Sequence, residues 1–255
     1  MTPRITAVDR KPTRRAVLTA AAAASIASTA RADPAGLVEP HMRLTQPSGS
    51  RPTVAITLDA CPGAFDWRIA NALVQGGVPA TIFVSAPWMR RNPPALAFLL
   101  AHSDLFSLQN HGARHLPCVI GAERVWGLAP AGDLGRVRDE VAGGARAVAE
   151  ATGRPPTWFR GAAAIYSPPA LDLIRQMGFG VAAFSLNGDE GASLPAANVA
   201  ARIGAAVDRD VVISHINQPL RASGPGVASG ILRLRQQGVR FVRLDAIRPS
   251  DMTYS

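Results

Sequence analysis

Short apolar runs alternate with longer segments of helical period through most of the chain. Seven apolar runs are predicted to be buried strands: 53–58, 81–84, 105–109, 157–160, 180–185, 211–214 and 240–244. Six segments between them have the spacing of helices: 65–75, 94–101, 134–152, 168–177, 195–207 and 226–237. Strands that alternate with helices predict a parallel sheet with right-handed crossovers. Seven such strands in about two hundred residues favour an α/β fold with one irregular (β/α)7-type barrel domain over residues 53–255.

The chain before residue 53 does not follow this alternation. Residues 1–32 contain Arg14 and Arg15, then an Ala-rich apolar segment, then an A-x-A site at 30–32. This order predicts a secretory signal peptide that is cleaved after Ala32. An amphipathic first helix or a membrane anchor is the alternative, but the apolar run is short and stops at the A-x-A site. Residues 33–52 are interpreted as a loose lead-in.

The arginine pair lies in the sequence TRRAVL and resembles a twin-arginine signal. We therefore expect the twin-arginine export machinery to be a partner, and the mature protein to be periplasmic or secreted. After cleavage we expect no stable membrane anchor, because no later apolar run reaches transmembrane length.

The composition, 47% hydrophobic and 18% charged over 255 residues, excludes a disordered chain. The net charge is +9, but residues 1–32 hold six of the 27 basic residues and only one of the 18 acidic ones. The remaining 21 basic residues, all arginines, are scattered and form no run with interleaved aromatic residues. This distribution favours a solvated arginine-rich surface, so we expect no nucleic-acid partner.

Polar residues follow the ends of several predicted strands, where parallel β/α barrels place their chemistry. They are Asp59, His111 and His115, Arg160, Asp189 and Glu190, and His215. Each type of residue also has a structural explanation, such as a helix N-cap for Asp59 or an ion pair for Arg160. Two histidines four residues apart are more often solvated or core residues than a metal site. Their joint occurrence at one face predicts a single pocket.

Five ordered segments resemble the motifs of the polysaccharide deacetylases of carbohydrate esterase family 4. They are 57–62 (TLDACP), 111–115 (HGARH), 159–161 (FRG), 185–191 (SLNGDEG) and 214–215 (SH). The resemblance extends from about residue 53 to 245, and 78–84 (VPATIFV) is similar to the family's second strand. It implies a carbohydrate substrate whose acetamide is hydrolysed by a water that a divalent metal, most often zinc, activates.

The resemblance also implies a role for each residue. Asp59 would be the general base and Arg160 would hold it, while His111 and His115 would bind the metal. His215 would be the general acid. These residue types suit the reaction, because an amide needs an activated water and its amine leaving group needs a proton.

Several positions depart from the family pattern. The second Asp of the first motif, a metal ligand in the family, is Ala60 here, and we expect this position to lie on a loop at the pocket. Either Asp59 moves onto the metal, Asn110 or a cysteine substitutes, the metal is held weakly, or the chemistry proceeds without it. The groove Trp of the fourth motif aligns with Gly191. The aligned Asp of the same motif is Asn187, which leaves Asp189 as the nearest candidate to orient His215.

The two cysteines, Cys61 and Cys118, lie close in sequence to Asp59 and His115. A disulfide between them is one hypothesis for an exported protein. Buried free thiols and a soft metal ligand are the alternatives, and a nucleophilic Cys61 is less favoured.

The sequence thus predicts an exported hydrolase that removes N- or O-acetyl groups from a carbohydrate. One alternative is a weak or inactive homologue that binds a carbohydrate or a small ligand in the same pocket. Another is an amidohydrolase that acts on a non-polymer C–N bond.

Overall fold

The computed structural model describes residues 1, 36–45, 49 and 51–255. The predicted signal peptide, apart from Met1, and part of the lead-in lie outside the described residues. Within the described part of the chain, no helix combines the length and the apolar character that crossing a membrane requires.

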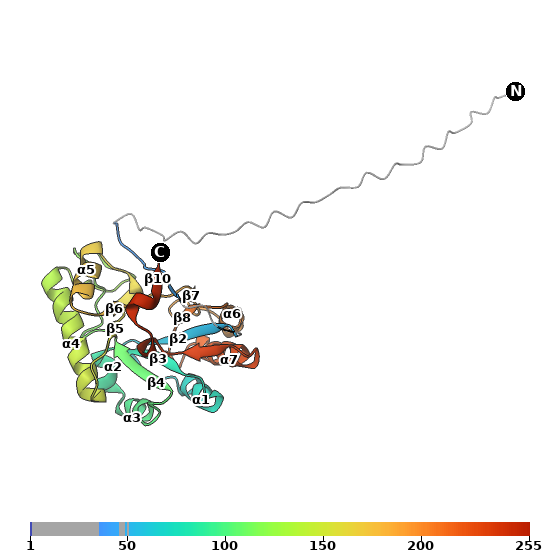
Figure 1. Cartoon of the computed structure of the whole chain (residues 1–255). Helices are drawn as coiled ribbons and strands as arrows, with labels where there is room; N and C mark the ends of the chain where they lie inside the picture. Colours follow the sequence, from blue (N-terminus) through green and yellow to red (C-terminus); the bar gives the residue numbers. More distant parts are fainter. Residues whose placement is uncertain (2–35, 46–48, 50) are drawn as a thin grey trace.

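One curled, parallel sheet forms the centre of the domain (Figure 1). Its order is β6 (Gly180–Val181), β5 (Trp158–Phe159), β4 (Phe106–Asn110), β3 (Ala80–Val84), β2 (Thr53–Ala60), β8 (Val211–His215) and β7 (Leu186–Asn187). An additional strand, β9 (Arg240–Val242), pairs with β2. The end strands β6 and β7 do not pair with each other in the described residues, so the barrel stays open between them. This arrangement confirms the irregular (β/α)7-type barrel that the sequence predicts.

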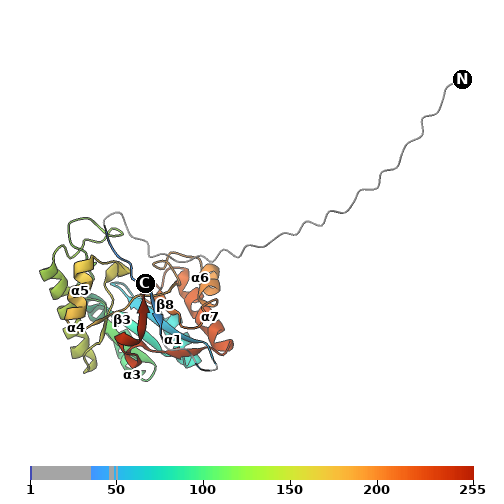
Figure 2. The ribbon, with the colours of Figure 1, turned by 45° about the horizontal axis from the view of Figure 1, so that its top comes forward.

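Seven helices surround the sheet. They are α1 (Trp67–Gly76), α2 (Ala86–Arg91), α3 (Pro93–Ala101), α4 (Leu134–Thr152), α5 (Pro168–Gln176), α6 (Ala196–Ile203) and α7 (Ser223–Gln236) in the described part of the chain. Figures 1 and 2 show α4 and α5 on one flank of the sheet and α6 and α7 on the other. The sequence analysis missed α2, a six-residue helix that Ser85 caps and that ends where Pro93 begins the next helix.

The central strand β2 is buried along its whole length, as expected for a parallel strand covered on both faces. Successive side chains of a strand point to opposite faces. Ile56, Leu58 and Ala60 belong to the core cluster beneath the helices. Thr57 and Asp59 therefore face the interior of the barrel. In the register of the sheet, Asp59 lies beside His215 of β8.

The end strand β7 was not predicted, and the predicted run 240–244 gives β9, which lies off the main order of the sheet. Two other segments also differ from the sequence-based expectation. The run 180–185 forms only the two-residue strand β6, because the carbonyls of Ala182 and Ala183 accept hydrogen bonds from the Arg160 guanidinium. The lead-in is not entirely loose, because β1 (Met42–Leu44) pairs antiparallel with β10 (Met252–Tyr254). The apolar side chains of this pair complete a core cluster inside the barrel.

Candidate active site and metal centre

A pocket of about 1230 Å³ brings together residues from the ends of several strands. Asp59, Cys61, His111, His115 and His215 all line it. The first two lie at the end of β2, the next two follow β4, and His215 ends β8. The sheet register gathers these residues, because the carboxyl ends of parallel strands meet at one edge.

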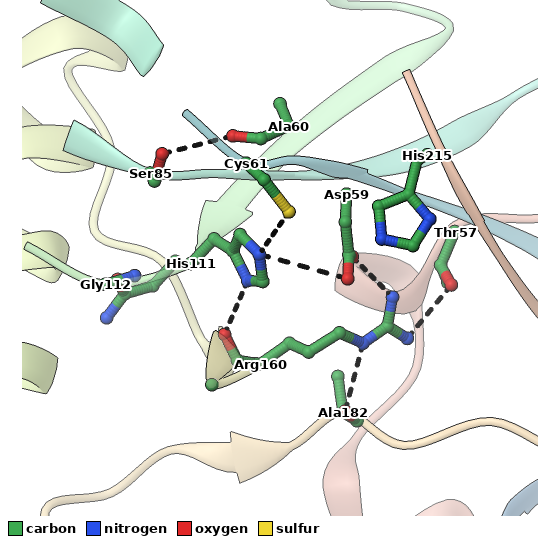
Figure 3. Close-up of polar contacts among 12 residues, drawn as sticks. Thr57, Asp59, Ala60, Cys61, Ser85, His111, Gly112, Arg160, Ala182 and His215 are labelled. Carbon is green, nitrogen blue, oxygen red and sulfur yellow. Dashed lines mark hydrogen bonds and ion pairs between the residues drawn. The ribbon is translucent and has the colours of Figure 1, made fainter. Parts of the chain in front are cut away.

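Asp59 is held by Arg160 from beneath the pocket (Figure 3). The Arg160 Nη1 donates to Asp59 Oδ1 at 2.8 Å, and both side chains are buried. The same guanidinium donates to the Thr57 hydroxyl at 2.9 Å. Burial raises the pKa of the Asp59 carboxyl, but the charges of Arg160, His111 and His215 and the hydrogen bond from Arg160 together hold the pKa below its usual value. Asp59 is therefore a carboxylate at neutral pH.

The His111 ring has a fixed orientation and tautomer. Its Nδ1 lies 2.7 Å from the carbonyl oxygen of Arg160, and a carbonyl can only accept, so Nδ1 carries the proton. Nε2 then faces the pocket, 3.4 Å from Cys61 Sγ and 3.9 Å from Asp59 Oδ2 (Figure 3). A histidine held in this way is arranged as metal-ligating histidines are, with the second nitrogen bonded to an outer partner.

His115 is positioned through its backbone. It has a φ of 66°, in the left-handed region that few residues other than glycine adopt. Oε1 of the buried Glu140, from α4, accepts from the backbone N–H groups of His115 at 2.7 Å and Leu116 at 3.0 Å. The His115 ring lies 4.9 Å from the His111 ring, and its Nε2 is buried without a hydrogen-bond partner among the described residues.

Sequence reasoning did not identify Glu140 as part of the site. The signal that could have identified Glu140 is its position on α4. It is an acidic residue on the buried face of the helix, where Val137, Val141 and Val148 also lie. A carboxylate buried on a helix face needs partners, and the loop after His111 supplies them.

The buried Asp189 and the partly buried His215 form a second polar pair. Asp189 Oδ1 lies 2.9 Å from His215 Nδ1, and Asp189 Oδ2 accepts from the His215 backbone N–H at 2.7 Å. Burial lowers the pKa of the imidazole, but the hydrogen bond and charge of Asp189, together with those of Cys61, raise the pKa well above its usual value. Because Nδ1 is bonded to Asp189, Nε2 is the nitrogen left for a substrate.

Asn217, two residues beyond His215, also lines the pocket. Both polar atoms of its side chain are buried and have no hydrogen-bond partner among the described residues. A buried amide without partners is rare in folded proteins and is expensive to maintain. The sequence offered only its position at a strand end as a signal for this residue.

The expectation that residue 60 lies on a loop at the pocket is wrong. Ala60 is the last residue of β2, is fully buried in the core cluster, and has a carbonyl that accepts from the Ser85 hydroxyl at 3.1 Å. Pairing of β2 with β3 continues through Ala60 and turns its side chain away from Asp59. Asn110 is not available as a ligand either, because its side chain bonds the backbone of Val141 and Gly112.

The hypothesis of a Cys61–Cys118 disulfide is also wrong in this structure, where both cysteines are free. Cys118 is buried in an apolar cluster with Phe159 and Tyr166. Burial raises the pKa of its thiol, which makes it unreactive. Cys61 instead points into the pocket toward His111 (Figure 3). Although burial raises the pKa of the Cys61 thiol, the neighbouring imidazoles, chiefly His111, hold it well below its usual value.

A metal could be held by Cys61, His111 and His115. Among the described residues these three form the group whose donor atoms all lie within 4.8 Å of one another. A sulfur and two imidazole nitrogens are donors that zinc accepts in proteins. The residues present therefore fit a divalent metal of this type.

Comparisons with solved structures show the same fold. A family 4 carbohydrate esterase from Streptomyces lividans, in complex with acetate, is 17% identical with a TM-score of 0.61, and the match covers 78% of this chain and 94% of that one. A peptidoglycan deacetylase from Bacillus subtilis is 20% identical with a TM-score of 0.62, covering 77% and 90%. A carbohydrate esterase family 4 pseudoenzyme from Bacillus anthracis is 17% identical with a TM-score of 0.61, covering 78% of this chain and 66% of that one.

No curated protein matches the sequence. The family model for polysaccharide deacetylase matches residues 46–182, more than half of the chain and including Asp59, both histidines of the candidate metal centre and Arg160. Strand order, pocket position and family model agree, and the chain belongs to the polysaccharide deacetylase family, whose members are hydrolases of non-peptide C–N bonds.

Proposed function

We propose that the protein is an exported deacetylase that hydrolyses N- or O-acetyl groups of a carbohydrate. The observation that carries the proposal is a pair of complementary groups in one pocket. Asp59 is a buried carboxyl whose pKa Arg160 helps to hold below its usual value, and His215 is an imidazole whose pKa Asp189 helps to raise. A base and an acid whose environments push their pKa values apart are what acid–base hydrolysis of an amide requires.

The reaction follows from these positions. Asp59 takes a proton from a water molecule, and the oxygen of that water attacks the carbonyl carbon of the acetyl group. The resulting tetrahedral carbon expels the amine nitrogen of the sugar as His215 Nε2 gives that nitrogen a proton. The products are acetate and a free amino sugar. Arg160 holds the base in position, and Asp189 holds the acid.

A divalent metal held by His111, His115 and a third donor would polarise the acetyl carbonyl and make the water more acidic. His111 Nδ1, bonded to the Arg160 carbonyl, keeps the Nε2 lone pair directed at that position. Glu140 fixes the loop that carries His115. Asn217 offers an unpartnered donor and acceptor to a substrate in the same pocket.

The test is acetate release from a panel of N- and O-acetylated glycans and small acetamides. Asp59→Asn and His215→Ala should each reduce kcat by at least about 10²-fold, the lower end of what general acid–base catalysis contributes. Asp172→Asn, at an exposed position of α5, is the matched control and should leave activity unchanged. Full activity in both site variants would overturn the mechanism.

A catalytically weak carbohydrate-binding homologue is the second candidate. The observation that favours it is the buried Ala60 at the position of the family's metal-binding Asp. Glycan binding by the wild-type protein with no acetate release from any member of the panel would establish this alternative. Release from small acetamides alone would indicate an amidohydrolase of non-polymer substrates.

A further inference from the structure

The residue at the position of the family's metal-binding carboxylate is Ala60, and the next residue, Cys61, lines the pocket. Ala60 points into the core, so even an acid at that position would face away from the histidines. Cys61 is the first residue after β2, two residues beyond Asp59, and the alternation of the strand continued to this position places it on the same face as Asp59. Its side chain lines the pocket.

The distances suit a shared metal ion. Zinc lies about 2.3 Å from a thiolate sulfur and about 2.1 Å from an imidazole nitrogen, so two such ligands at a tetrahedral angle are about 3.6 Å apart. Cys61 Sγ and His111 Nε2 are separated by 3.4 Å. The donor of His115 lies within 4.8 Å of both. The three donor atoms are thus close to the separations that one shared ion requires.

Each of the two histidines presents one ring nitrogen to Cys61 or to no other group in the described part of the chain. His111 Nδ1 is occupied by the Arg160 carbonyl, which leaves Nε2 as the donor. His115 Nε2 is buried and has no hydrogen-bond partner among the described residues. A buried nitrogen without a partner points to a ligand that the protein itself does not supply.

The charge of the site supports the same assignment. Two neutral imidazoles alone give a weak site for a divalent cation, and a thiolate restores the negative charge that Ala60 removes. Asp59 Oδ1 already accepts a hydrogen bond from Arg160 Nη1 at 2.8 Å. Two nitrogens and a soft sulfur favour zinc over magnesium or calcium, which prefer oxygen. Three protein ligands leave a fourth position open to the pocket, as in catalytic zinc sites.

We propose that Cys61, His111 and His115 form a Cys–His–His zinc site, in which the Cys61 thiolate replaces the carboxylate of the family pattern. The proposal deepens the proposed function by naming the third ligand, but metal binding is measured without any substrate. Zinc binding without acetate release would overturn the proposed function alone. Acetate release with metal binding that does not depend on Cys61 would overturn this assignment alone.

The experiment compares the wild-type protein with Cys61→Ser and Cys118→Ser. The wild type and Cys118→Ser should bind one zinc ion, and the protein loaded with Co²⁺ should show a sulfur-to-metal charge-transfer band in the near ultraviolet. Cys61→Ser should lose that band. Its zinc affinity should fall by more than the about 10- to 100-fold that the loss of an outer-shell partner costs. Unchanged zinc affinity in Cys61→Ser, or a Co²⁺ protein with no sulfur band, would overturn the assignment.

A second variant guards against a folding defect. Cys61→Asp supplies a carboxylate from the same position and should recover zinc binding while lacking the sulfur band. If Cys61→Ser and Cys61→Asp both have the wild-type circular dichroism and both fail to bind zinc, residue 61 acts through its thiolate. If Cys61→Asp binds zinc no better than Cys61→Ser and neither differs from the wild type, Cys61 is not a ligand.

The remaining alternative for Cys61 is a nucleophile. Zinc should protect Cys61 from alkylation by iodoacetamide, and removal of the metal by a chelator should expose it. Mass spectrometry of the protein mixed with an acetylated substrate distinguishes the two roles. An S-acetyl group on Cys61 in the native protein would assign the nucleophilic role and overturn the zinc ligand.

Discussion

The carboxylate of Glu140 holds the backbone of His115, with Oε1 accepting from the His115 N–H at 2.7 Å. The same carboxylate accepts from the N–H groups of Arg114 and Leu116, both at 3.0 Å. Helix α4 thus fixes the loop that carries the second histidine. A Cβ at Gly112 would collide with Glu140, so the start of this loop is packed against the same carboxylate.

Glu140→Gln should destabilise the protein and weaken its metal site. The Gln side chain has only one acceptor oxygen, and its NH₂ group would face backbone N–H groups that need an acceptor. Buried N–H groups would therefore lose their partners, which lowers the free energy of unfolding by about 1–3 kcal/mol. Denaturant unfolding and zinc titration measure the two effects. Glu150→Gln, at an exposed position of the same helix, should change neither. Wild-type stability and zinc affinity in Glu140→Gln would show that the loop does not depend on the carboxylate.

Arg160→Lys should reduce both stability and turnover, although it keeps the positive charge. The guanidinium bonds Asp59, Thr57 and two carbonyls at once, and an ammonium cannot reproduce this planar set. Each buried acceptor that loses its donor costs about 1–3 kcal/mol. Thermal unfolding and kcat are the measurements, with Arg175→Lys at the exposed end of α5 as the control. Equal activity in both variants would contradict a positioning role for Arg160.

Asp189→Asn should move the alkaline limb of the kcat/KM profile to lower pH. Asp189 raises the pKa of His215, and a general acid must be protonated, so the rate falls as pH rises through that pKa. Without the carboxylate the pKa of His215 drops and the fall begins earlier. A pH series of initial rates shows the shift, and Asp245→Asn at an exposed position should leave the profile unchanged. An unshifted profile would remove His215 from the acid role.

Asn217→Ala should lower kcat/KM without lowering stability. Its side-chain amide makes no hydrogen bond within the described residues, so its removal leaves no partner unsatisfied. If the amide bonds the substrate, its loss should cost at least about tenfold, or about 1.4 kcal/mol of binding or transition-state energy. Asn198→Ala, at an exposed position of α6, is the control. A stability loss with unchanged kinetics would identify a structural role instead.

Replacing Arg14 and Arg15 by Lys should retain the precursor in the cytoplasm. The twin-arginine reading requires the guanidinium pair and not merely positive charge. Cell fractionation measures the effect, and Arg4→Lys in the same leader is the matched control. Unchanged export of the double variant would indicate the general secretory route.

The sequence by itself determined the order of most strands and helices and the strand ends at which the polar residues lie. Both are local properties: periodicity reports burial, and the carboxyl ends of parallel strands share one edge. Asp59, His111 and His215 could therefore be placed at one pocket without coordinates. The five segments in order identified the family before any contact was known.

Only the tertiary structure decided which side chains face that pocket and what holds them. A strand that continues by two residues turns Ala60 into the core and leaves Cys61 at the site, because neighbours on a strand point to opposite faces. Arg160 lies 101 residues from its partner Asp59 in the sequence. Glu140 lies 25 residues from its partner His115. Such pairs depend on where folding brings separate elements together, and no periodicity along the chain encodes them.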